Sequence, residues 1–208
     1  MASPEVRFLG PLGAPATVGG VFPVGGVGVM LLLVAASGLL CGLLAAALRP
    51  RLGWVSAIAI AGFVWSLAVL GTITLLPADG APGIVAAEGR QTTCSWDIGG
   101  PAPEGFWIVP GGQRLLNVVV FIPSGALLVV AVARWRAARV LVPAGLALLA
   151  AYSVAIEATQ LELARLDRAC DVTDVIDNVT GAVFGVGIGI VLAVLLRPWR
   201  YRRPRRLA

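Results

Sequence analysis

Long apolar stretches limit what this sequence can fold into more than any other feature. Five of them, at 27–48, 54–76, 115–133, 140–161 and 172–196, are each close to or longer than the ~20 helical residues that cross a hydrocarbon core of ~30 Å. The chain is 58% hydrophobic and 13% charged, whereas a soluble globular domain carries about 25% charge. The sequence therefore predicts an all-α transmembrane protein, a five-helix membrane bundle occupying 24–196.

The placement of arginine predicts which way the bundle faces. The connections 49–53 and 134–139 and the tail 197–208 carry arginines and no acidic residue, and positively charged connections stay in the cytoplasm. We therefore expect a flexible extracytoplasmic tail at 1–23, one long extracytoplasmic loop at 77–114 and a basic cytoplasmic tail at 197–208, in a multi-pass protein of the cell membrane. The first residues lack the features of a cleaved signal peptide, so we expect none.

The charged residues also exclude some chemistry. The formal net charge is +5, and the chain has no histidine and no lysine. A catalytic histidine, a lysine nucleophile and a histidine metal ligand are therefore excluded. We assign the basic tail to anionic lipid head groups and not to nucleic acid, because arginine clusters beside membrane spans bind such head groups. The sequence does not identify a cofactor.

The cysteines fit the predicted orientation. Cys94 and Cys170 both fall on the extracytoplasmic side, and Cys41 lies inside the first span. We favour a Cys94–Cys170 disulfide, because that compartment is oxidising, with Cys41 as a packing residue. The alternative, that both are unpaired small apolar residues, stays open.

Polar residues recur at helical spacing near the extracytoplasmic ends of the last three spans. They are Arg114, Asn117 and Ser124 in the third span, Ser153, Glu157 and Gln160 in the fourth, and Asp171, Asp174 and Asn178 in the fifth, with Arg168 just before it. Each set falls on one helix face, and such faces should turn into the bundle or a water-filled cavity. Asp177 falls outside the sector of the fifth span, and we leave it out of the set.

Structural interpretations compete with chemical ones at several of these positions. Glu157 is flanked by apolar residues on both sides and is a candidate acid or base, or one half of an ion pair with Arg114 or Arg168. Asp171 and Asp174 are weak candidates for a divalent-cation site, or they cap the last helix. For the ladder Gly181, Gly185 and Gly189 we expect only helix packing, because small residues at this spacing let two membrane helices approach closely.

Four blocks of sequence, in order, resemble one family. They are Thr72-Ile-Thr-Leu-Leu-Pro77, Asn117-Val-Val-Val-Phe-Ile-Pro-Ser-Gly125, Ser153-Val-Ala-Ile-Glu-Ala-Thr-Gln160, and Arg168-x-x-Asp171-x-x-Asp174-x-x-x-Asn178-x-x-Gly181-x-x-x-Gly185. Together they are similar to the VanZ-like family of bacterial membrane proteins, which is named for a protein associated with resistance to the glycopeptide antibiotic teicoplanin. The resemblance covers about 72–189 and leaves out the first span and both tails.

The resemblance implies a role in the cell envelope, linked to glycopeptide resistance of the teicoplanin type. We expect an outward-facing polar site in the membrane that binds or processes a lipid or a lipid-linked envelope precursor. The candidate catalytic residues are Glu157, Asp174, Asp171 and Arg168, and the candidate substrate-binding residues are Asn117, Gln160, Asn178, Ser153 and Arg114. Turnover of a substrate, a non-catalytic scaffold and a proton- or ion-coupled transporter stay open as alternatives.

Overall fold

A computed structural model describes residues 25–76, 92–98, 112–162 and 170–200. Within them the protein is all-α, as predicted. Its elements are α1 (Val27–Leu75), α2 (Gly112–Val132), α3 (Ala138–Glu162), α4 (Val172–Leu196) and a short 3-10 helix, η2 (Pro198–Arg200). The four α-helices of this part of the chain are long and apolar enough to span a membrane. The tail 1–23, most of the loop 77–114, Arg168 and the tail beyond 200 lie outside the described residues.

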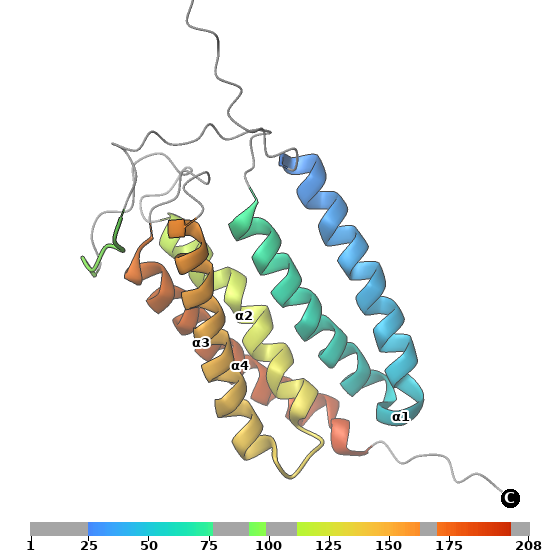
Figure 1. The fold of residues 1–208 in the computed structure, drawn as a ribbon. Helices are drawn as coiled ribbons and strands as arrows, with labels where there is room; N and C mark the ends of the chain where they lie inside the picture. The colour runs from blue at the N-terminus through green and yellow to red at the C-terminus, as the bar shows by residue number, and fades with distance from the viewer. Residues whose placement is uncertain (1–24, 77–91, 99–111, 163–169, 201–208) are drawn as a thin grey trace, which may run out of the picture.

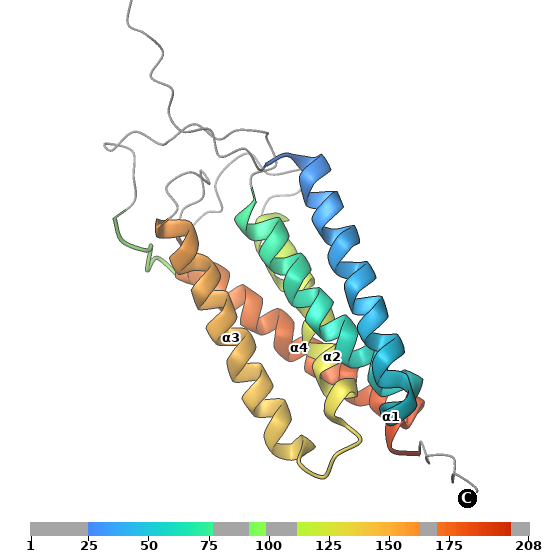
Figure 2. The same cartoon turned by 45° about the vertical axis from the view of Figure 1, so that its right-hand side comes forward.

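The first element, α1, covers two of the spans that the sequence predicts, those at 27–48 and 54–76. It has 49 residues, with Pro50 inside it, and consists of two helical limbs. The backbone leaves helical geometry at Gly53, whose φ is 76°, a left-handed conformation that glycine adopts without a steric penalty. Figures 1 and 2 show α1 folding back there, so that its two limbs run side by side. The Trp65 indole N–H donates across the limbs to the Val34 carbonyl, at 3.1 Å.

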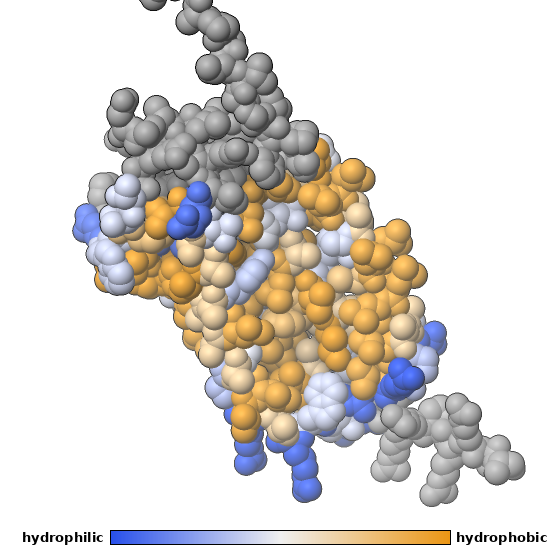
Figure 3. Space-filling model, in the orientation of Figure 1, coloured by the Kyte–Doolittle hydropathy of each residue, from blue (hydrophilic) through white to orange (hydrophobic). Residues whose placement is uncertain are grey.

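The bundle has two chemically different ends with an apolar band between them. The turn at Gly53, the α2–α3 connection and the end of α4 lie together at one end in Figure 1; we call it the arginine end, because these segments carry Arg49, Arg51, Arg134, Arg136, Arg139 and Arg197. The opposite end, with the start of α4, is the disulfide end. Figure 3 shows a broad hydrophobic surface between hydrophilic residues at either end, the pattern that a surrounding lipid bilayer requires.

The α2–α4 contact sets the spacing of the bundle. Glycines on both helices bring the two backbones together, so that an added Cβ would overlap a carbonyl group of the partner helix: Val118 for Gly181, Ile122 for Gly185 and Ala182 for Gly125. At Gly189 a Cβ would lie 2.6 Å from the Ala126 carbonyl oxygen. The packing role predicted for the glycine ladder is therefore confirmed.

α1 and α3 pack around this pair. Leu70 of α1, Phe121 of α2, and Leu149 and Ile156 of α3 form one buried cluster. The Tyr152 hydroxyl of α3 donates to the Leu67 carbonyl of α1 at 2.8 Å. All four helices thus reach a common core, and the polar ends of α2, α3 and α4 are fixed relative to one another.

Candidate functional site

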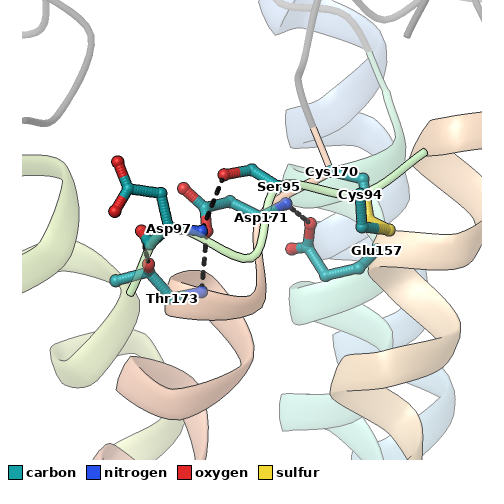
Figure 4. Close-up of a disulfide and its surroundings, with 7 residues drawn as sticks. All are labelled: Cys94, Ser95, Asp97, Glu157, Cys170, Asp171 and Thr173. Carbon is teal, nitrogen blue, oxygen red and sulfur yellow. Dashed lines mark hydrogen bonds between the residues drawn. A yellow bond between two sulfur atoms is a disulfide. The ribbon is translucent and has the colours of Figure 1, made fainter. Parts of the chain in front are cut away.

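The disulfide end carries a short segment that is fastened to the start of α4. The predicted Cys94–Cys170 disulfide is confirmed and joins positions 76 residues apart. The backbone N–H of Ser95 donates to the Cys170 carbonyl at 2.9 Å, and the N–H of Val172 donates to the Ser95 carbonyl at 3.1 Å, forming an isolated parallel bridge. We call residues 92–98 the strap. Figure 4 shows the strap crossing the first turn of α4.

Asp171 and Glu157 both bond the first turn of α4. Asp171 is the N-cap residue, and its carboxylate accepts from the Thr173 N–H at 2.8 Å. The capping interpretation of Asp171 is therefore confirmed, because this bond satisfies an N–H that lacks a helical partner. In turn, the Asp171 N–H donates to the Glu157 carboxylate of α3 at 3.2 Å (Figure 4). Glu157 is 5% exposed and links α3 to the beginning of α4.

Arg114 of α2 and Asp177 of α4 form an ion pair that the sequence analysis missed. The guanidinium Nε and Nη2 donate to the two carboxylate oxygens of Asp177 at 2.9 and 3.1 Å. This two-bond geometry is the strong form of an arginine–carboxylate contact. The Asp177 side chain is 8% exposed, and that of Arg114 is 43% exposed. The pair thus has a buried acidic half and a basic half that reaches the surface.

One signal in the sequence could have found this pair. An arginine in the first turn of an apolar helix needs a carboxylate at the same depth, and Asp177 is the acidic residue of α4 that lies farthest into the helix. The wheel of α4 sets Asp177 apart from Asp171, and the two residues bond different helices: Asp177 bonds α2 and Asp171 bonds α3. A wheel places the residues of one helix but not the helices around it.

Three further predicted polar residues bond across helix interfaces. The Asn178 amide of α4 donates to the Ser153 hydroxyl of α3 at 2.9 Å, and both residues are buried. The buried Gln160 amide donates to the Thr74 carbonyl near the end of α1, at 3.0 Å. These three predicted residues therefore lie inside the bundle, where they join α3 to α4 and to α1.

The polar face of α2 divides between two neighbours. Ser124, deeper in the helix, donates to the Ser66 hydroxyl of α1 at 2.9 Å. Asn117 lies one turn below Arg114. Its amide nitrogen is buried and, within the part of the chain that the structure describes, has no hydrogen-bond partner. A buried donor without an acceptor is unfavourable, so this amide is the one predicted binding residue whose position calls for a further group.

The remaining candidates give a mixed result. Asp174 lies in the first turn of α4 and is partly buried, and Arg168 lies outside the described residues. Among residues 25–76, 92–98, 112–162 and 170–200, no group of three or more Asp, Glu or Cys residues is placed to hold a metal ion. The described candidates come together mainly as pairs: Glu157 with Asp171, Ser153 with Asn178, and Arg114 with Asp177.

Comparison with known proteins agrees with the resemblance seen in the sequence blocks. Residues 63–195 match the VanZ/LLP1 family. The match begins in the second limb of α1, includes α2 and α3, and ends next to the last residue of α4, so it contains both residues of the pairs Glu157–Asp171, Ser153–Asn178 and Arg114–Asp177. No curated protein and no solved structure matches the chain. On a match that covers well over half of its length, the chain belongs to the VanZ/LLP1 family.

Proposed function

We propose that this multi-span VanZ-family protein binds an anionic head group, that of a membrane lipid or of a lipid-linked envelope precursor, at its disulfide end. The proposal rests on Arg114, whose guanidinium is held by Asp177 and is still partly exposed. Asp177 holds its Nε and Nη2, yet 43% of the side chain stays exposed. The guanidinium is thus fixed in direction, and its outer N–H groups face away from Asp177 toward an incoming phosphate or carboxylate.

Asn117 supports the same site. It lies three residues after Arg114 on α2, so the two side chains share a helix face. The buried amide nitrogen is a donor without an acceptor among the described residues. A head group whose charged oxygen meets Arg114 could place an ester or hydroxyl oxygen at Asn117. Two donors at successive depths suit a lipid that enters from the side of the membrane.

The proposal includes a topology. A straight helix of 49 residues would be about 73 Å long, at ~1.5 Å per residue, more than twice a hydrocarbon core of ~30 Å. We therefore propose that each limb of α1 crosses the membrane once, which gives five crossings. The exposed arginines favour a cytoplasmic arginine end, and the disulfide favours an oxidising compartment at the other end. The head-group site then opens outward.

We favour binding over turnover, because three carboxylates near the site already make structural contacts. Asp171 caps α4, Asp177 pairs with Arg114, and Glu157 accepts the Asp171 N–H. Each bond holds its carboxylate in a structural contact. An outward-facing head-group site would lie where glycopeptide antibiotics meet the envelope, so susceptibility to teicoplanin-type drugs is the phenotype to test.

The test is complementation of a strain that lacks the gene. Arg114→Gln and Asn117→Leu remove the two proposed contacts, and Arg136→Gln removes one positive charge from the exposed surface of the arginine end. At matched abundance in the membrane, we expect the first two to lose the effect on glycopeptide susceptibility and on the envelope lipid profile, and Arg136→Gln to keep both. Full complementation by both site variants would contradict the proposal.

A second candidate function is a non-catalytic scaffold. It is favoured by the number of polar side chains that bond one helix to another, such as Asn178 to Ser153 and Gln160 to Thr74. In a scaffold, any variant that keeps the thermal stability of the bundle should keep the phenotype. Arg114→Gln or Asn117→Leu with normal stability and a lost phenotype favours the head-group site, and normal stability with a normal phenotype favours the scaffold.

The topology has a separate test. In intact cells, a membrane-impermeant thiol reagent should label Cys94 and Cys170 only after treatment with an impermeant reductant. Labelling of these cysteines only after the membrane is permeabilised would place the disulfide end in the cytoplasm and reverse the proposed orientation.

A further inference from the structure

The strap is held against α4 by more than its disulfide. In addition to the Cys94–Cys170 bond, two backbone hydrogen bonds join Ser95 to Cys170 and Val172. The Thr173 hydroxyl also donates to the Asp97 carbonyl at 3.4 Å. The links cover several successive residues, so they fix the direction of the strap as well as its position. Figure 4 shows the disulfide beside the start of α4, and Asp97 and Thr173 together at its first turn.

The strap keeps two large apolar side chains away from the protein. Ser95 and Asp97 use backbone groups to contact α4, whereas Trp96 is 77% exposed and Ile98 is 65% exposed. A fastened segment has little freedom to hide such side chains by moving. Exposed apolar groups on a fixed segment call for a surface that covers them.

The depth of the strap identifies that surface. The strap is fastened to residues 170–173, where α4 begins, and α4 is long and apolar enough to span a membrane. In Figures 1 and 2 the strap, drawn in green, lies next to the upper ends of α3 and α4. Ile176, one turn into α4, is also exposed. The strap therefore lies where the lipid-facing band of the helices ends.

We propose that the strap is an interfacial membrane anchor, with Trp96 and Ile98 inserted into the head-group layer of the bilayer next to α4. Tryptophan is suited to this depth, because its ring is apolar and its indole N–H still finds a hydrogen-bond acceptor there. The anchor fixes the height of α4's first turn, and with it Glu157 and Asp171, relative to the bilayer. It requires only that the bundle spans a membrane, and it depends neither on the Arg114 site nor on the orientation.

Tryptophan fluorescence in lipid vesicles tests the anchor. The chain has six tryptophans, so the Trp96 signal is obtained as the difference between the wild-type protein and Trp96→Phe, with Trp96→Tyr as the substitute if the first variant does not fold. We expect lipids brominated near the head group to quench this difference signal more strongly than lipids brominated deep in the chain. Aqueous iodide should quench it less than it quenches free tryptophan.

Two results would overturn the anchor. Quenching by iodide as strong as for free tryptophan, with no effect of either brominated lipid, would place Trp96 in water. Protection from iodide and from both lipids would place it against a protein surface, such as a second copy of the chain.

The double variant Cys94→Ser/Cys170→Ser provides the control for the tether. If the disulfide sets the depth of Trp96, then in this background the difference signal loses its preference for the shallow lipid and gains quenching by iodide. An unchanged depth profile would show that the disulfide does not position the anchor.

Discussion

The two ends of the bundle handle charge in opposite ways. At the disulfide end, two carboxylates are buried and bonded: Asp177 receives two bonds from Arg114, and Glu157 receives the Asp171 N–H. At the arginine end, side chains such as Arg136 and Arg139 are exposed. A buried carboxylate depends on the geometry of its partner, because that partner must compensate its desolvation. Exposed arginines act through their number and position on the membrane surface.

The disulfide end is therefore suited to binding one specific head group, and the arginine end to a general attraction for anionic lipids. The arginine end also uses charge structurally at one point, where Arg134 donates to the Leu52 carbonyl at 2.6 Å beside the turn of α1. Arg49 lies over the Trp54 ring with 4.5 Å between the guanidinium carbon and the ring centroid. These contacts hold the turn and leave the other arginines of the connections exposed. We therefore expect the stability and binding of the disulfide end to depend on the exact geometry of its contacts, and the exposed arginines to tolerate substitution.

The largest effect is expected at the α2–α4 contact, because these helices carry Arg114 and Asp177. In Gly181→Val the new side chain would overlap the Val118 carbonyl group, and a backbone cannot yield as a flexible side chain does. We expect a loss of at least ~4 kcal/mol in the free energy of unfolding, or no folded protein.

The matched control for this prediction is Gly187→Val in the same helix. A Cβ there meets no atom within 4 Å, so we expect a change within about 0.5 kcal/mol. Denaturant titration in mild detergent measures both variants. Equal stability of the two would mean that the close backbone contact does not hold the bundle together.

A smaller effect, confined to the disulfide end, is expected on removal of the disulfide. The double variant Cys94→Ser/Cys170→Ser should lower the free energy of unfolding by about 2–4 kcal/mol. It should also expose the strap to limited proteolysis, and the arginine end should keep its protection. Cys41→Ser is the control, because Cys41 is a free cysteine, and it should behave like the wild-type protein. Equal protease sensitivity at both ends would contradict the local role of the disulfide.

The smallest effect on stability is expected for one buried hydrogen bond. Ser153→Ala leaves the Asn178 amide without its acceptor, and hydrogen bonds between membrane helices contribute about 1 kcal/mol. Thr180→Ala is the control, because Thr180 is exposed and donates only within its own helix, to Ile176. Thermal unfolding followed by circular dichroism measures both. A loss for Thr180→Ala as large as that for Ser153→Ala would remove the distinction between inward and outward polar groups.

Residue patterns within one helix were sufficient for part of this structure. The range of α4, Val172–Leu196, agrees with the span expected at 172–196, because an N-cap aspartate and a long apolar run mark its limits. The glycine ladder and the disulfide followed in the same way from spacing and compartment. Each of these features follows from the spacing of residues along one helix, or from the side of the membrane on which the residues lie, and both can be read from the sequence.

Features that depend on neighbouring helices were missed by patterns within a single helix. The partner of Arg114 is set by how α2 and α4 are rotated about their axes, which the glycine contact fixes only in the folded bundle. The division of α2's polar residues between α4 and α1 has the same origin. The break of α1 at Gly53 falls between the spans expected at 27–48 and 54–76, but helical geometry continues through Pro50 up to that break, which a proline by itself does not reveal.

The most direct test of the head-group site is a binding titration that compares one arginine from each end. Short-chain phosphatidylglycerol and a short polyprenyl phosphate, which represent the lipid and the lipid-linked precursor, are titrated into purified protein and followed by native mass spectrometry. We expect at least one of them to bind the wild-type protein and Arg136→Gln alike, and to bind Arg114→Gln about tenfold more weakly. Equal binding to Arg114→Gln and the wild-type protein, or an equal loss in Arg136→Gln, would contradict a specific site at the disulfide end.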